Sequence, residues 1–346
     1  MVSNYDIIVV GAGPASSIFC RYISNRYSVL RLDGSFGREK PCGGLLAPQS
    51  VSFLKEIDLC VPDEVMVEPR VRHIRTMDLG TGRERNYPRN YVNMDRKKFD
   101  DWLMGLSRDN VVTVPAKAVN IRKGRDQYIV SLKFEDGLQR KVTCRYLVGA
   151  DGAGSIVRRE LFKGRKDPIK HYVSIQEKYR LKDDEIFACI FDRETSPSCS
   201  WLFTKEDEIS FGGAYEPQGA RDNFEKQKKK LRDDQGYRLG ELLESSACMI
   251  YRPRRRSDFM LGDGTMFLAG EAAGFISPTS FEGISYAMKT GKALAEAFDS
   301  EDILSSYGKK VKHLQGDILK KRFKRPFMYD QLLRNLVLIS GLQAEK

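Results

Sequence analysis

A glycine-rich turn near the N-terminus is the clearest place where residue type and spacing predict chemistry. Gly11-Ala12-Gly13-Pro14-Ala15 follows a β-branched run at residues 5–10 and begins a segment of helical character. Gly11 permits a tight turn, and Gly13 lets backbone N–H groups approach a pyrophosphate at a helix N-terminus. Asp33, which ends the next apolar run, is placed to bind an adenosine ribose. This order of features favours a dinucleotide site over a purely structural turn.

A second run of small residues lies near the C-terminus, where Gly270-Glu271-Ala272-Ala273-Gly274 follows a short apolar segment. An NAD-binding fold has no use for a second glycine-lined strand end, so this run favours FAD. We expect Glu271 to hydrogen-bond a ribityl hydroxyl. A helix beginning near Gly283 and Ile284 would direct its N-terminus at the flavin edge where negative charge develops on reduction. The alternative is a buried strand beside a small-residue helix crossing.

A third motif, Lys40-Pro41-Cys42-Gly43-Gly44, places a thiol beside two glycines. Paired glycines allow backbone to lie flat against a planar ring, so Cys42 is expected to face the isoalloxazine. Two roles for Cys42 stay open. It is either a catalytic residue with a redox or proton-donating function, or a small hydrophobe that packs and positions the flavin.

The elements that must position these motifs follow from hydrophobic periodicity. Strands are expected at residues 5–10, 28–32, 111–118, 128–134, 141–148 and 266–269, and helices at 14–26, 96–107, 222–232 and from 283 onward. Residues 68–91 alternate between polar and apolar side chains, which is typical of a β-hairpin. Strand patterns also dominate residues 170–215. An α/β fold with an FAD-binding Rossmann-like domain at 1–69, 92–165 and 258–300 is predicted. An antiparallel β-sheet substrate domain at 70–91 and 166–257 would be inserted in it, and C-terminal helices would occupy 301–346.

Two further segments carry a resemblance to known flavoproteins. The stretch 146–159 contains Asp151-Gly152, and Arg96 begins a helical segment. Together with the two glycine-rich turns, they resemble the flavoproteins built like para-hydroxybenzoate hydroxylase and glutathione reductase. The resemblance implies that Asp151 borders the FAD and that Arg96 reaches its phosphate-ribose portion. It also implies that Ala118 belongs to the cofactor site.

The motif at residues 40–48, combined with 270–277 and 282–287, is similar to the geranylgeranyl reductase family and most of all to its CbrA-type members. The CbrA-type resemblance also includes residues 189–192, 200–201 and 211–215. It implies an apolar substrate site at Trp201, Phe203 and Gly212. Isoprenoid-reducing members carry a tyrosine and a proline in this stretch that are absent here.

These observations predict an FAD-dependent oxidoreductase. The leading hypothesis is a reductase that delivers hydride from reduced flavin to a carbon–carbon double bond of an apolar, isoprenoid or lipid-like substrate. NAD(P)H or ferredoxin would donate the electrons. One alternative is a monooxygenase of the aromatic-hydroxylase type, and another is a non-catalytic, membrane-associated flavin-binding protein.

Composition restricts the compartment, the metal content and the partners that we expect for this protein. Seven cysteines without a CxxC pair are typical of a reducing cytoplasm, and three scattered histidines predict no metal site. The net charge of +11 is concentrated at residues 252–256 and 309–325. No nucleic-acid motif accompanies it. A cytoplasmic monomer is expected, and its basic tail at 308–346 is either a peripheral contact with an anionic membrane or a solvated surface helix.

Overall fold

The protein is represented by a computed structural model that describes residues 3–38, 40–181 and 184–341. A mostly parallel sheet is built around β1 (Ser3–Val10), which pairs in parallel with strands on both sides. Residues 7–10 are all buried, as expected for a strand covered on both faces. The spatial order is β16 (Gly262–Asp263), β17 (Met266–Leu268), β10 (Gln139–Gly149), β1, β2 (Val29–Leu32) and β7 (Val111–Val114).

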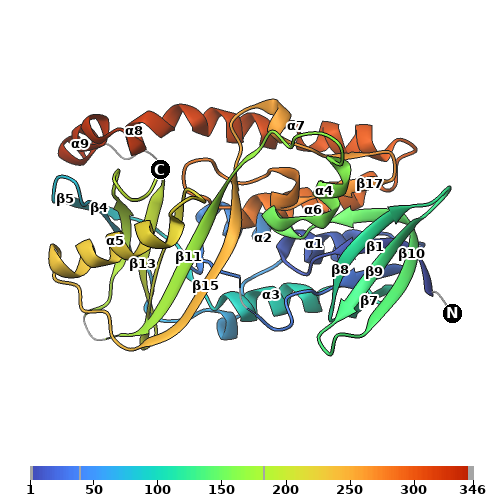
Figure 1. The fold of residues 1–346 in the computed structure, drawn as a ribbon, viewed down its shortest axis with the longest axis horizontal. Coiled ribbons are helices and arrows are strands. Elements are labelled where there is room, and N and C mark those ends of the chain that lie inside the picture. The colour runs from blue at the N-terminus through green and yellow to red at the C-terminus, as the bar shows by residue number, and fades with distance from the viewer. Residues whose placement is uncertain (1–2, 39, 182–183, 342–346) are drawn as a thin grey trace.

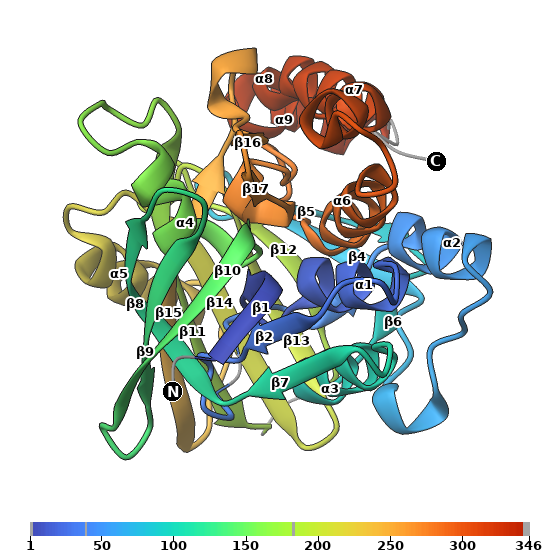
Figure 2. The same ribbon diagram turned by 90° about the vertical axis from the view of Figure 1, so that its right-hand side faces the viewer.

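Helices and a hairpin cover the two faces of this first sheet (Figure 2). The helices on one side are α1 (Pro14–Tyr22), α6 (Ile284–Ala297) and α7 (Ile303–Lys321), and the hairpin on the other is β8 (Ala116–Lys123) with β9 (Tyr128–Phe134). A Cβ atom on Gly291 would lie 2.2 Å from the carbonyl oxygen of Ala15. Helices α1 and α6 therefore cross in near backbone contact. Shorter helices are α2 (Pro48–Glu56), α3 (Arg96–Gly105) and α4 (Ile156–Leu161).

The second sheet has seven strands and is antiparallel except for one pairing. Its order is β15 (Leu242–Arg252), β11 (Lys170–Arg180), β14 (Glu208–Tyr215), β13 (Cys199–Lys205), β12 (Phe187–Phe191), β4 (His73–Asp78) and β5 (Arg83–Pro88). Helix α5 (Ala220–Asp233) covers one face, where Phe224 stacks on Phe211. The other face is turned toward the first sheet. The short strands β3 (Leu45–Leu46) and β6 (Val92–Asn93) pair separately.

The C-terminal segment crosses from the first sheet to the second along the top of the molecule (Figure 1). Helix α7 buries Tyr307, Val311, Leu314 and Ile318. A 3-10 turn (Arg322–Lys324), α8 (Arg325–Tyr329) and α9 (Gln331–Ser340) follow. In α9 the buried Arg334 donates from Nε to Asp78 at 2.8 Å, which ties the helix to the β4–β5 hairpin. Within the described ranges, no helix has the length and apolar character needed to cross a membrane.

The predicted α/β fold is confirmed, and several local details differ. The first helix ends at Tyr22 instead of near residue 26. The segment expected as one strand at 111–118 is two strands, because Pro115 has no N–H to continue the ladder. Helix α2 and strand β15 were not expected. Strand β15 contains Glu244-Ser245-Ser246, which interrupts the alternation of polar and apolar residues that would identify a strand. Its register is set by pairing with β11, which is distant in the sequence.

Candidate functional site

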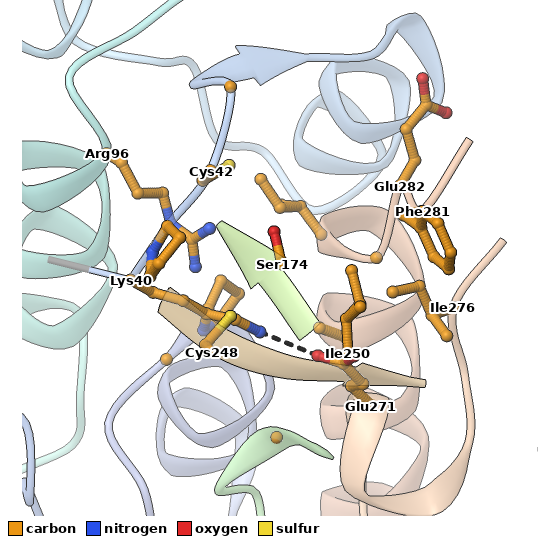
Figure 3. Close-up of a pocket in the computed structure, with 18 of the residues that line it drawn as sticks. Lys40, Cys42, Arg96, Ser174, Cys248, Ile250, Glu271, Ile276, Phe281 and Glu282 are labelled. Atoms are coloured by element: carbon orange, nitrogen blue, oxygen red, sulfur yellow. Dashed lines mark hydrogen bonds and ion pairs between the residues drawn. The ribbon is translucent and has the colours of Figure 1, made fainter. Parts of the chain in front are cut away.

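A cavity of about 940 Å³ lies between the two sheets and is lined by residues from both. One end is formed where β1, β2 and β10 of the first sheet finish. The other end is the face of the second sheet that is turned toward the first. Alternate residues of β4, β12 and β13 line it, together with Ser174 of β11 and residues 248–250 of β15. Figure 3 shows Ser174 of β11 and Cys248 and Ile250 of β15 in the wall, facing Lys40, Cys42 and Arg96.

The glycine-rich turn after β1 lies at the first end. Gly11 has φ +106°, and a Cβ there would lie 2.5 Å from the carbonyl oxygen of Ala150, so only glycine fits. A Cβ on Gly13 would meet nothing within 4 Å, because this backbone borders the open cavity. The turn therefore combines a close strand contact with room for a ligand, as pyrophosphate binding requires.

Two helices direct uncapped N-termini at the cavity. Helix α1 begins after Gly13 and α6 after Gly283, and neither has a side-chain cap. By contrast, Asp95, Asp302 and Asp330 cap α3, α7 and α9 with their carboxylates. The first N–H groups of α1 and α6 are therefore left to a ligand, and the helix dipoles favour one with negative charge.

Asp151 provides the strongest indication that a polar ligand belongs here. Its Oδ2 accepts from the N–H of Ile156 at 2.8 Å, whereas Oδ1 is buried with no hydrogen-bond partner among the described residues. Burial raises the pKa of this carboxyl to about 6, although hydrogen bonds from Ser155 and Ile156 oppose the shift. An orphaned acceptor in a cavity wall fits a hydroxyl- or amide-bearing cofactor such as FAD.

An ion pair connects the Lys40 loop to the second glycine-rich turn. Lys40 Nζ lies 2.8 Å from Glu271 Oε2, and Glu271 Oε1 accepts from the N–H of Tyr251 at 3.0 Å. Burial alone would lower the pKa of Lys40, but attraction to Glu271 outweighs it and the pKa is raised. The pair thus links the loop, the 3-10 helix Gly270–Ala273 and β15 at one point in the cavity.

Cys42 lies beside a charged pair in the same wall. Its sulfur accepts from the N–H of Gly44 at 3.4 Å. Arg96 Nε lies 3.1 Å from Asp100, whose pKa is raised because burial outweighs the attraction of the guanidinium. Burial also raises the pKa of the nearby Cys248 thiol. Four cysteines line the cavity, yet among the described residues no three His, Cys, Asp or Glu side chains are grouped to hold a metal ion.

The paired glycines of the Lys40 loop pack against the second sheet. A Cβ on Gly43 would lie 2.8 Å from the ring of Phe203. Gly44 has φ +62°, and Lys205 Nζ donates to its carbonyl oxygen at 2.9 Å. These glycines therefore let the loop lie directly on β13, a contact for which the sequence carries no signal.

Gly212 of β14 lies beneath Trp201. A Cβ there would lie 2.4 Å from Cζ2 of that indole, while Trp201 Nε1 donates to Gln176 Oε1 at 3.2 Å. Gly212 does not line the cavity itself, so it acts on the cavity by positioning Trp201.

Of the site residues predicted from the sequence, eighteen line the cavity: Gly11, Gly13, Pro14, Ala15, Asp33, Lys40, Pro41, Cys42, Gly43, Gly44, Arg96, Ala118, Asp151, Trp201, Phe203, Glu271, Gly283 and Ile284. Gly270 and Gly274, like Gly212, lie behind the wall. Gly270 packs near the Cβ of Ala15, and Gly274 near the backbone of Asp258. The sequence reasoning missed wall residues from β15 and from α8 and α9.

Comparisons with known proteins agree with this geometry. Residues 116–320 match the family model described as an FAD binding domain. The chain is 34% identical to Protein CbrA of Escherichia coli O139:H28 and of Shigella sonnei, over 99% of this chain and 98% of each relative. A geranylgeranyl bacteriochlorophyll reductase-like protein from Thermoplasma acidophilum has the same fold, with TM-score 0.80, 18% identity, and coverage of 99% and 93% of the two chains. A triple mutant of a flavin-dependent brominase has TM-score 0.70 and 19% identity, with coverage of 98% and 96%.

Proposed function

The chain belongs to the CbrA family of FAD-binding flavoproteins, and from this premise we propose that it is a reductase that saturates a carbon–carbon double bond of an apolar, lipid-like substrate. One observation carries the proposal. The cavity continues without interruption from the glycine-rich turns into a lobe with largely apolar walls. That lobe is lined by Ile74, Tyr87, Phe191, Trp201, Phe203, Met328, Val337 and Leu338.

The cofactor end has a residue set suited to FAD. The N–H groups after Gly13 would bind the pyrophosphate, and Asp33 the adenosine ribose. Asp151 offers an unpaired acceptor to a cofactor hydroxyl or amide. FAD bound here would supply the hydride chemistry, which no side chain of the protein can provide.

The protein's own contribution is orientation, exclusion of water and control of a proton. The aromatic rings of Trp201 and Phe203 give the substrate a flat, dry wall. Saturation of a double bond requires a proton as well as a hydride. Cys42 lines the cavity and is next to Gly43, which packs on Phe203, so it is our candidate for holding that proton.

Cys42→Ser tests this role, with Cys248→Ser as the matched control because Cys248 lines the same wall. Loss of turnover in Cys42→Ser alone, with the FAD content of both variants unchanged, would support proton transfer at Cys42. Full turnover in Cys42→Ser would restrict this residue to packing.

The proposed activity is tested by extracting apolar compounds that co-purify with the yellow protein and following their masses under anaerobic reduction. A gain of two hydrogens, with NAD(P)H or reduced ferredoxin as the donor, is the expected result. Turnover that consumes oxygen stoichiometrically would instead identify a monooxygenase. If neither donor reduces any lipid or quinone acceptor, the protein is a flavin-binding module.

A further inference from the structure

We propose that the C-terminal helices and the neighbouring arginine loop form a docking surface for an anionic lipid bilayer, beside the cavity's apolar lobe. This C-terminal face consists of Arg254, Arg255, Arg256, Lys320, Arg322, Phe323, Phe327, Leu332, Leu336 and Ile339. Figures 1 and 2 both place α7, α8 and α9 along the upper side of the molecule. The docking is independent of the proposed function, whereas direct loading of a lipid-like substrate rests on it.

The first observation is an apolar helix side that faces outward. Leu332, Leu336 and Ile339 of α9 lie on one side of the helix, at spacings of four and three residues, and are at least 61% exposed. The opposite side buries Arg334 and Leu338. Globular proteins normally place polar side chains on the outward side of a surface helix, so this arrangement favours an apolar partner.

Two aromatic side chains extend this apolar side. Phe323 is 72% exposed and Phe327 is 53% exposed. Together with the three aliphatic residues of α9, they are the five most exposed large apolar side chains among the described residues. Such side chains are gathered in one segment of 17 residues. This concentration indicates a common surface and differs from the scattered exposure that most proteins show.

The second observation is concentrated positive charge around Phe323, one of these apolar side chains. Residues 303–341 contain nine Lys and Arg but two Asp. Arg254, Arg255 and Arg256 meet Lys320, Arg322 and Phe323 around a smaller cavity, and Arg322 Nη1 donates to the Arg254 carbonyl oxygen at 2.8 Å. Asp258 accepts from Arg255 Nε at 3.4 Å, and from the backbone N–H groups of Arg254 and Arg255.

These cations influence one another. The pKa of Arg325 is lowered by burial and by the positive charges of Arg252 and Arg254. Like charges held together favour an anionic partner, which relieves their repulsion. Apolar side chains that project between cations match a bilayer with acidic headgroups, whereas nucleic acid offers no place for projecting leucines.

The third observation is that the same helices form a wall of the cavity. Met328, Val337 and Leu338 line its apolar lobe, and Phe327 both lines the cavity and reaches the surface. A bilayer seated on the outward side of α8 and α9 would therefore lie one helix thickness from the lobe. A lipid-like substrate could pass from the bilayer to the lobe at Phe327.

The test is flotation of the full FAD-loaded chain with phosphatidylcholine vesicles, with and without phosphatidylglycerol. We expect binding to the anionic vesicles. The triple variant Phe323→Ser, Leu332→Ser, Leu336→Ser should reduce the partition coefficient at least about tenfold, since three apolar side chains no longer insert. Val112→Ser, Leu138→Ser, Leu242→Ser is the matched control, because these residues are also exposed but lie elsewhere, Val112 and Leu242 on strands and Leu138 in the turn between β9 and β10. It should bind like the wild type.

The charge contribution is tested with Arg256→Gln and Lys320→Gln. Each should weaken binding to anionic vesicles about fivefold, the fold-change that corresponds to about 1 kcal/mol per cation near such a surface, and added salt should diminish the difference. The exposed residues Lys123 and Lys133 provide matched controls as Lys123→Gln and Lys133→Gln. The 450 nm absorbance of every variant reports whether it still folds and binds FAD.

No binding to anionic vesicles, or equal binding by the wild type and the triple variant, would overturn the proposal. If the wild type forms a dimer that the triple variant loses, and neither binds vesicles, the face is a protein interface and the bilayer assignment is wrong. Vesicle binding without reduction of any lipid would support the docking surface and contradict the proposed reductase function.

Discussion

The unpaired oxygen of Asp151 has a consequence for stability that can be measured in the FAD-free protein. Burial raises the pKa of this carboxyl from about 3.8 to about 6. A shift of this size corresponds to about 3 kcal/mol, at about 1.4 kcal/mol per unit. Because the folded pKa is above the unfolded one, the folded chain holds the proton more tightly. The stabilisation is complete below about pH 4 and is lost as the pH rises through about 6.

Asp151→Asn removes the titration while keeping an acceptor for the Ile156 N–H. The difference in unfolding free energy between wild type and variant should therefore change by up to about 3 kcal/mol from pH 4 to pH 7, with the wild type losing stability relative to the variant. Urea denaturation of both FAD-free proteins at a series of pH values measures it. Asp126→Asn, at an exposed position, is the control. Parallel pH profiles for wild type and Asp151→Asn would refute the reasoning.

Three further predictions concern other contacts. Gly11→Ala places a Cβ against Ala150 at φ +106° and should abolish retention of FAD. The ratio of 450 to 280 nm absorbance reports the FAD content. A variant that retains one FAD per chain would contradict this prediction. Arg334→Met leaves the buried Asp78 without its cation and should lower the free energy of unfolding by about 3–5 kcal/mol. An unchanged midpoint of urea denaturation would exclude a stabilising ion pair. Lys40→Met should weaken FAD binding in a fluorescence titration because a cation leaves the cavity; equal affinity would place Lys40 outside the cofactor site.

Several features of the cofactor end were predictable because they are local. Strand β1, the turn at Gly11 and Gly13, and helix α1 are consecutive, so backbone conformation and spacing define them. Outside the cofactor end, the turn between β9 and β10 is local in the same way, because Asp136-Gly137 is typical of a hairpin turn and Gly137 has φ +87°. The resemblance carried by scattered motifs extended this reasoning to Asp151. Whether its Oδ1 has a hydrogen-bond partner, however, depends on which groups the fold brings near it.

The apolar end could not be read from spacing, because its walls come from segments that meet through long-range packing. Cys248 and Ile250 enter the cavity only because β15 pairs with β11 in one particular register. The basic tail was expected as one surface element, yet its α9 forms a wall of the lobe because Arg334 pairs with Asp78, 256 residues away.

The sequence by itself determined the cofactor class, the fold class and the positions of the glycine-rich turns, since these depend on consecutive residues and on motifs shared within a family. Only the tertiary structure decided how Gly43 contacts Phe203 and how the C-terminal helices border the apolar lobe. Those arrangements arise from burial and ion pairing between distant segments. Such free energies depend on which surfaces meet and not on the order of residues along the chain.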